Sequence, residues 1–419
     1  MKKYGRDNRP YIRPVKRVEL SETNVKIRMI AIVVLLAIAV TAIGTGLMSV
    51  LKTEPGWQLV QANSQKANCG SDFVLQYDFS LDGGDASAKY RQLEILYSQA
   101  VEEAFLIFSA DVEDAACANA AFLNAHLNEI VTVHEALYEA LSLVVQYNDR
   151  HVFTAPAAVE YNRVFLSEGD AEAMQYDPAH NAETARWLQD LAIFVSDEGH
   201  IGLDILDNNQ VRLNVSEEYL AFGEEYGIEI YLDFGWMTNA FRADYLADAL
   251  KDAGFTNGYL ASYDGFTRNL DTRGNSYSVN LFARNGNDIN LPAQLDYNRP
   301  VSIVALRDYP MTQEDRWHYY GYENGDIVTA FVDPVDCRSK CAISDLVCYS
   351  YDLGCAEVLM QSAKTFTADA FLEENLAQLT QEGIWSIWSQ GLTLMYNEKE
   401  AAVTALQNNG DAYSIINVS

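Results

Sequence analysis

The fold that this sequence predicts is decided by residues 228–265, which run IEIYLDFGWMTNAFRADYLADALKDAGFTNGYLASYDG. Apolar residues alternate with polar ones over 228–232, as in a strand with one buried face. Apolar side chains then recur every four residues over 237–253, which predicts an amphipathic helix. Asp233 is placed to cap this helix and Gly254 to end it, and residues 258–261 predict a second strand. Strand, helix and strand in this order predict a βαβ crossover with a parallel strand pair.

Outward from this stretch, the same patterns predict one α+β domain with a mixed sheet. Asn-rich and Gly-containing turns join residues 201–206 to 211–215 in one hairpin and mark another at 324–326. Beyond Gly265 we expect short, polar-rich strands. The remaining expected helices cover 93–108, 133–144, 187–194, 372–379 and a segment after Tyr351, and the remaining strands cover 73–79, 301–305, 384–389 and 392–396.

The segment from Asp233 to Phe241, DFGWMTNAF, resembles the Asp-Leu-Gly-Gly-Ile-Ala-Lys-Gly-Tyr signature of the FAD:protein FMN transferases, the ApbE-type flavin transferases. Further landmarks of that family follow in order. Asp308-Tyr309 matches the end of a Thr-Ser-Gly-Asp-Tyr segment, and Asp333-Pro334 matches His-Ile-Ile-Asp-Pro. The resemblance spans roughly residues 72–405. It implies FAD and Mg²⁺ as cofactors, with a cofactor-binding set of Asp233, Gly235, Asp308, Tyr309 and Asp333.

Several positions depart from the family pattern. Trp236 stands in place of a glycine, Asn239 in place of a lysine and Ala330 in place of a histidine. In the best register, Cys355 and Leu359 replace the aspartate and threonine that help to hold Mg²⁺ in the family. Mg²⁺ prefers oxygen ligands in an octahedral set, which these two residues do not supply. The flavin and Mg²⁺ site is therefore expected to be degraded, and no metal ligand or catalytic residue is assigned. Glu357 stays open either as a substitute ligand or as a solvated helix residue.

The resemblance leaves three functions open. The first is a pseudoenzyme of inactive or altered activity. The second is an active, divergent transferase that moves FMN from FAD onto a threonine of an extracytoplasmic acceptor protein. The third is a cell-surface binding or assembly module. Structural roles also remain open for the retained acids, since Asp233 fits a helix cap and Asp333-Pro334 a turn. The aromatic run around Trp317 fits either glycan or peptide binding or ordinary β packing.

The N-terminus predicts a membrane anchor. Residues 29–51 carry no charge, and 23 helical residues suffice to span a bilayer core of roughly 30 Å. Residues 1–28 have a net charge of +6, so positive-inside orientation places this tail in the cytoplasm and the C-terminal domain outside the cell membrane. The expected organisation is a cytoplasmic tail (1–28), a transmembrane helix (29–51), a stalk (52–71) and an extracytoplasmic domain (72–419).

The net charge limits the classes of binding partner, and the cysteine spacing bears on disulfide formation. The formal net charge is −30, which leaves −36 on the chain after the tail. Nucleic-acid binding is excluded, because phosphate recognition needs clustered Lys and Arg. A protein partner or flavin acceptor outside the membrane stays open. Four of the six cysteines crowd into residues 337–355, and in an extracytoplasmic domain this favours disulfides over zinc ligation or free thiols.

Overall fold

The computed structural model describes residues 56–64, 68–82, 85–114, 117–312, 315, 317–406 and 412–419. The predicted cytoplasmic tail and transmembrane helix lie outside these residues. No helix in the described ranges is long and apolar enough to cross a membrane. Part of the predicted stalk is described, and Trp57–Val60 within it forms a strand of the main sheet. This part therefore belongs to the domain rather than to a stalk.

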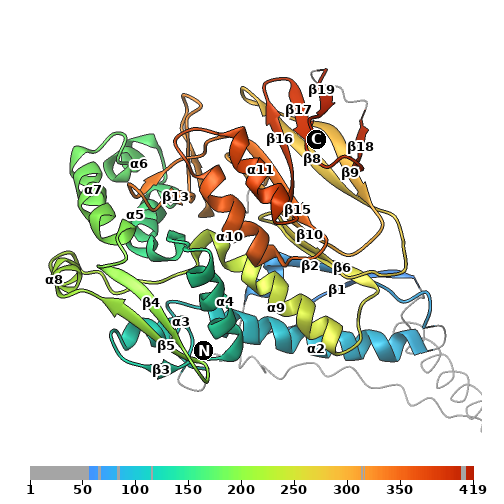
Figure 1. The fold of residues 1–419 in the computed structure, drawn as a ribbon, viewed down its shortest axis with the longest axis horizontal. Helices are drawn as coiled ribbons and strands as arrows, with labels where there is room; N and C mark the ends of the chain where they lie inside the picture. The colour runs from blue at the N-terminus through green and yellow to red at the C-terminus, as the bar shows by residue number, and fades with distance from the viewer. Residues whose placement is uncertain are drawn as a thin grey trace, which may run out of the picture. The chain divides into compact units, whose positions relative to one another are not determined.

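Nine strands of the described chain form one large mixed sheet (Figure 1). Neighbouring strands pair antiparallel except for the last pair, which is parallel. In order across the sheet they are β1 (Trp57–Val60), β2 (Phe73–Asp78), β6 (Gly258–Ser262), β7 (Phe266–Asn269), β10 (Val301–Arg307), β15 (Asp345–Ser350), β16 (Trp385–Gln390), β17 (Thr393–Tyr396) and β19 (Ser414–Asn417).

Smaller sheets complete the strand inventory of the described residues. They are β18-β9-β8 (Ala402–Ala405, Asp288–Tyr297, Tyr277–Asn285), β3-β5-β4 (Val131–Thr132, Gln210–Val215, Ile201–Leu206), β11-β12 (Tyr319–Gly321, Ile327–Thr329) and β13-β14 (Val332–Asp333, Arg338–Ser339). The hairpins β4-β5 and β11-β12 confirm the two predicted from turn residues. The β8-β9 hairpin is longer than the short strands expected beyond Gly265.

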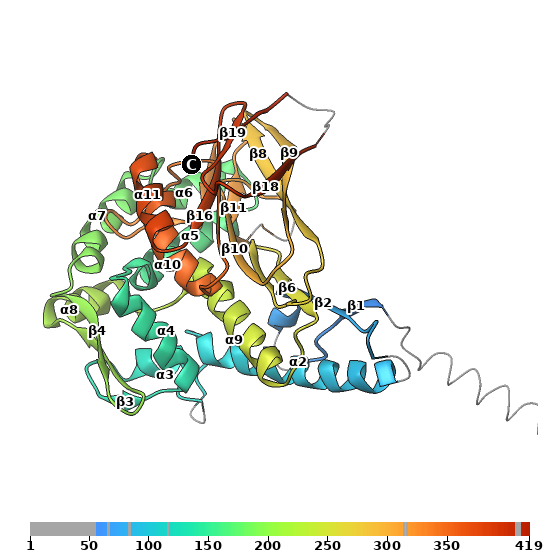
Figure 2. The same ribbon diagram turned by 45° about the vertical axis from the view of Figure 1, so that its right-hand side comes forward.

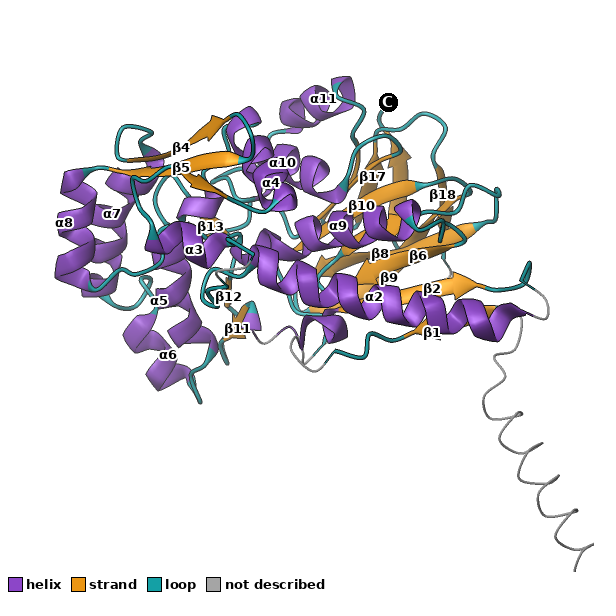
Figure 3. Ribbon diagram, turned by 90° about the horizontal axis from the view of Figure 1, so that it is seen from below, coloured by secondary structure: helices purple, strands orange, loops and turns teal. Residues whose placement is uncertain are grey.

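The helices divide into two groups, as Figure 2 and Figure 3 show. Helices α2 (Ala86–Phe108), α9 (Thr238–Asp252) and α10 (Cys355–Phe366) pack against one another or the main sheet, and α11 (Glu373–Gln381) packs on β16. The second group lies to one side of the main sheet, part of it around β3-β5-β4 and part of it beside β11-β12. It comprises α3 (Ala120–Ala125), α4 (Glu135–Gln146), α5 (Ala155–Phe165), α6 (Asp170–Tyr176), α7 (Ala182–Ser196) and α8 (Glu217–Tyr226).

For residues 228–265 the prediction is right for the second half and wrong for the first. Helix α9 and strand β6 are confirmed, and Gly254 ends the helix with φ +79°. Residues 228–232 form no strand, and β6 pairs antiparallel with β2 and β7, so the predicted βαβ crossover is absent from this part of the chain.

A buried asparagine explains the missing strand. Asn124 Oδ1 accepts hydrogen bonds from the N–H groups of Tyr231 and Leu232, both at 3.0 Å, and its Nδ2 donates to Leu232 O at 2.8 Å. These backbone groups are thus satisfied by a side chain rather than by a neighbouring strand. Tyr231 and Leu232 are both buried, so the apolar pattern marked a core segment correctly but not its conformation.

The predicted disulfides among the clustered cysteines are wrong, because Cys337, Cys341, Cys348 and Cys355 are all free. Cys117 is free as well. The four clustered residues fall in a hairpin turn, a loop, a strand and a helix start, and three of the sulfurs have other partners. Cys341 lies 3.7 Å from Thr329 Oγ1, Cys348 lies 3.6 Å from Ser386 Oγ, and the Cys355 thiol donates to Thr267 O. Burial raises the pKa of all four thiols, which makes them unreactive.

Candidate functional site

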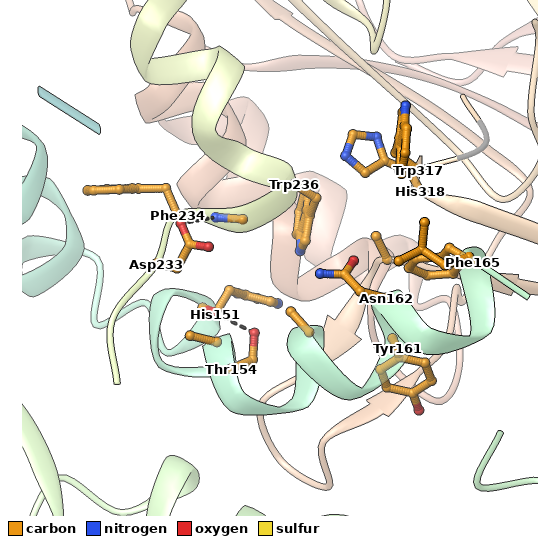
Figure 4. Close-up of a pocket in the computed structure, with 15 residues that line it drawn as sticks. His151, Thr154, Tyr161, Asn162, Phe165, Asp233, Phe234, Trp236, Trp317 and His318 are labelled. Atoms are coloured by element: carbon orange, nitrogen blue, oxygen red, sulfur yellow. Dashed lines mark hydrogen bonds between the residues drawn. The ribbon is translucent and has the colours of Figure 1, made fainter. Parts of the chain in front are cut away.

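Two adjoining cavities of about 360 and 940 Å³ form one cleft between α5, the start of α9 and the segment before β11. Both cavities are lined by Asn162, Asp233, Gly235, Trp317 and His318. Figure 4 shows the smaller cavity with its lining residues. A concave site that joins apolar walls to a few polar groups is the usual form of a small-molecule site.

Asp233 and Gly235 bring the family signature into this cleft. Gly235 has φ +52°, a left-handed conformation that favours glycine, and its N–H donates to Asp233 Oδ1 at 3.1 Å. A short 3₁₀ helix, η4 (Gly235–Met237), then precedes α9, whose N-terminus no side chain caps. Asp233 therefore forms a local turn with Gly235 and caps neither η4 nor α9, which corrects the predicted role. Burial raises the pKa of Asp233, and the nearby Asp111 carboxylate raises it further.

Trp236 fills the space next to this turn. Its side chain is only 9% exposed and meets the rings of His151 and Phe331 edge-on, with centroids 5.8 and 4.9 Å away. In Figure 4 the indole lies between His151 and His318. Within the described chain, its Nε1 is buried without a hydrogen-bond partner. The family resemblance places a glycine here, so a bulky ring now occupies a position of close backbone approach.

The polar end of the cleft lies in the larger cavity. Asn239 Nδ2 donates to Asp264 Oδ2 at 2.9 Å, and Asn239 Oδ1 accepts from Arg242 at 3.3 Å. Arg242 in turn lies 4.0 Å from Asp72 and stacks over the Phe105 ring at 5.6 Å. The resemblance places a lysine at Asn239. The structure brings this position to the cleft, but a neutral amide replaces the cation.

The sequence assigned none of the six histidines to a site, yet His151 is buried and lines the smaller cavity. His151 Nδ1 lies 3.0 Å from Asp149 Oδ2, and Nε2 lies 3.0 Å from Thr367 Oγ1. Burial would raise the pKa of Asp149, but the His151 ring and N–H hold it below its usual range. Only the Asp-x-His spacing signals this group. The hydroxyl group that His151 contacts belongs to Thr367, which does not line the cleft. This group of side chains therefore holds the His151 ring beside Trp236 and presents no hydroxyl nucleophile to the cleft.

The other three predicted site residues lie outside the cleft. Asp308 accepts from Arg284 at 3.0 Å and from Ser344 at 2.9 Å. Tyr309 is buried and donates to Asp345. Asp333 forms an ion pair of 2.8 Å with Lys340 and accepts from the N–H of Val335 in a turn. Each of these side chains is engaged in contacts within the fold.

The positions that the resemblance assigns to Mg²⁺ ligands do not fit a magnesium ion. Cys355 and Leu359 are both fully buried, and Cys355 is the first residue of α10. The N–H groups of Cys355 and Ala356 donate to the Asp244 carboxylate, both at 2.8 Å, and that carboxylate also pairs with Arg268. An amino-acid side chain has thus taken the place of an anion at this helix N-terminus.

Gly354 shows how closely this cap is packed. A Cβ at Gly354 would lie 2.5 Å from Asp244 Oδ2 and 3.1 Å from Arg268 Nη1. Glu357, a further carboxylate at this helix start, accepts from Tyr147 OH and Gly354 N–H, both at 3.4 Å. The described residues include no group of three or more His, Cys, Asp or Glu that could hold a metal ion. The polar groups at the N-terminus of α10 are thus paired with one another, as in a capped helix, and are not arranged around a metal ion.

Comparison with known proteins rests on structure alone. No protein-family model matches the chain, and no curated protein does. Among solved structures, the ApbE protein of Thermotoga maritima matches with a TM-score of 0.54 and 11% identity, over 83% of this chain and 96% of the other. The flavin transferase ApbE of Vibrio cholerae matches with a TM-score of 0.53 and 12% identity, over 84% of this chain and 97% of the other.

These matches establish the fold. The chain has an α+β, ApbE-like fold with a large mixed sheet, which confirms the resemblance read from residues 233–241. At 11–12% identity, a shared fold does not carry the chemistry of the site with it.

Proposed function

We propose that this protein is a ligand-binding relative of the flavin transferases, a pseudoenzyme that does not carry out Mg²⁺-dependent FMN transfer. The observation that carries the proposal is the closed N-terminus of α10. There the Asp244 carboxylate, which is paired with Arg268, accepts the N–H groups that an anion would need, and Cys355 and Leu359 offer no oxygen ligand to a metal ion. Transfer at a phosphoryl centre depends mainly on positioning and charge neutralisation, and both are weakened by these changes.

The cleft supports the same proposal. Trp236 occupies a position where the family needs close backbone approach, and Asn239 supplies no positive charge for a pyrophosphate. Ala330 lines the smaller cavity without a titratable group where the family has a histidine. The cleft nevertheless remains open over both cavities, and this favours binding without transfer.

An assay for covalent flavin tests the proposal. The purified full-length protein, incubated with FAD, Mg²⁺ and an acceptor peptide that an active flavin transferase labels, should leave the peptide without flavin fluorescence. The active enzyme, run in parallel with the same peptide, is the positive control. Mg²⁺-dependent labelling by this protein would overturn the proposal. It would instead support an active, divergent transferase, for which the retention of Asp233 and Gly235 in the cleft is the favouring observation.

We further propose that residues 29–51 anchor the domain in the cell membrane, with the domain on the extracytoplasmic side. The uncharged run and its basic flank support this. Protease added to intact cells should remove the C-terminal domain and leave cytoplasmic proteins undigested. Protection of the domain in intact cells, with digestion after lysis, would contradict the orientation.

A further inference from the structure

The larger cavity of the cleft is strongly acidic. Five aspartates line it, against one arginine and one histidine. The acidic residues are Asp72, Asp111, Asp233, Asp264 and Asp315, and the basic ones are Arg242 and His318. Asp315 is already occupied, because it accepts the N–H groups of Met311 and Thr312. The other four have fewer partners and come from four separate segments of the chain.

These carboxylates influence one another. Burial raises the pKa of Asp72 to about 6, Arg242 opposes this shift, and the Asp264 carboxylate adds to it. Burial likewise raises the pKa of Asp233 and of Asp264; Asp111 adds to the first shift, and His318 opposes the second. Mutual repulsion in a partly desolvated cleft is relieved when a positive charge enters it.

One oxygen atom of these carboxylates lacks a hydrogen-bond partner. Asp264 Oδ2 accepts from Asn239, but Oδ1 is fully buried and has no partner among the described residues. A buried acceptor without a donor costs free energy. Arg242 lies nearest to Asp72, at 4.0 Å, so the one arginine that lines this cavity does not neutralise the whole group. The carboxylates that line this end of the cleft thus outnumber its basic side chains.

Aromatic rings stand beside the acidic groups. Tyr263 is 57% exposed and Trp317 is 50% exposed, and both line the cavity. Phe105 and Phe108 line it from the end of α2. Large exposed rings next to carboxylates are the arrangement that recognises ammonium groups, because the ring faces and the carboxylates both attract a cation. The same arrangement repels phosphate and carboxylate ligands.

We propose that this cleft binds a small organic cation, an amine or quaternary ammonium carried on an apolar or aromatic body, between the Tyr263 and Trp317 rings and the carboxylates of Asp72, Asp233 and Asp264. This inference names the ligand class for the binding function proposed above and rests on it. A volume of about 940 Å³ accommodates such a molecule with several rings or a chain of methylenes.

Three probes of matched shape test the charge preference by titration calorimetry with the full-length protein. They are phenethylamine, a cation; phenethyl alcohol, which is neutral; and 3-phenylpropionate, an anion. Phenethylamine should bind about tenfold more tightly than the alcohol or better, and the anion should bind most weakly. The affinity for phenethylamine should fall as the pH is lowered through about 6, because Asp72 then takes up a proton.

Two variants and a control locate the effect. Asp264→Asn should reduce the preference for phenethylamine over the alcohol, and Trp317→Ala should weaken both. Asp248→Asn, in a second acidic groove on the outer part of α9, removes the same charge and should leave the affinity unchanged. Equal affinities for the three probes, or an equal loss in the Asp248→Asn control, would overturn the inference. The covalent-flavin assay tests the proposed loss of FMN transfer, and the calorimetry tests the proposed cation binding. A failure of one proposal can therefore be told apart from a failure of the other.

Discussion

Replacing Cys355 by aspartate, the residue that the family carries there, is expected to destabilise the protein by about 3–5 kcal/mol rather than to create a metal site. Cys355 is fully buried, and its thiol donates to Thr267 O at 3.3 Å with Ile303 O at 3.8 Å. A carboxylate would face these carbonyl oxygens and the Asp244 carboxylate without a donor. The N–H groups of Cys355 and Ala356, which could otherwise donate to the new carboxylate, already donate to Asp244.

Denaturant unfolding of Cys355→Asp and of Cys355→Ser separates charge from packing. The serine hydroxyl keeps a donor for Thr267 O, so this control should lose no more than about 1.5 kcal/mol. Excess Mg²⁺ should not restore stability to Cys355→Asp, alone or combined with Leu359→Thr. A double variant that is as stable as the native protein and gains stability with Mg²⁺ would show that the site is latent rather than closed.

Sequence patterns predicted the fold where local periodicity and tertiary packing agree. Helix α9 and strand β6 follow from spacing alone, and the β4-β5 hairpin follows from its Asn-rich turn. The error at 228–232 arose because alternation reports burial, whereas a strand also needs a partner. Here the partner is the Asn124 side chain, more than a hundred positions away in sequence. Local pattern does not contain this contact.

The site was predicted in part for a similar reason. The resemblance led to Asp233 and Gly235, which do line the cleft, and to Asp308 and Asp333, which form ion pairs elsewhere. Asp72 shares the acidic cavity but belongs to no motif, and only the folded chain places it near Arg242. The disulfide prediction was wrong because cysteines that are close in sequence were expected to have their sulfur atoms close in space. A hairpin, a strand and a helix start direct these side chains to different partners.

Arg273→Ala is expected to destabilise the protein by about 3–5 kcal/mol at neutral pH. Arg273 holds two buried carboxylates, with Nη2 at 2.8 Å from Asp271 Oδ2 and Nη1 at 2.9 Å from Asp78 Oδ2. Asp271 is fully buried and also accepts from Asn275 and Tyr277, so the group joins the end of β2, the segment after β7 and the start of β8. Removing the cation leaves two carboxylates close together without their counter-charge.

The pH dependence of this loss distinguishes a charge effect from a packing effect. Burial alone would raise the pKa of Asp271, but the hydrogen bonds from Arg273 and Tyr277 hold it well below its usual range. The native protein therefore has this stabilisation above pH ~4, the unfolded pKa, and loses it as the pH falls toward the lower folded value. Without Arg273 the burial effect prevails and the folded pKa rises, so protonation relieves the variant. The difference in free energy of unfolding between the two proteins should thus shrink as the pH is lowered from 7 to 4.

The exposed pair Arg212–Asp204 on the β4-β5 hairpin provides the matched control, because it joins the same two residue types with about 40% of each side chain exposed. Arg212→Ala should cost no more than about 1 kcal/mol and show little pH dependence. If Arg273→Ala and Arg212→Ala cost the same in urea unfolding, or if the Arg273 effect is constant from pH 7 to 4, the buried group does not act through charge. A larger and pH-dependent loss for Arg273→Ala than for Arg212→Ala would show that the buried group, with its two carboxylates, stabilises the fold through charge.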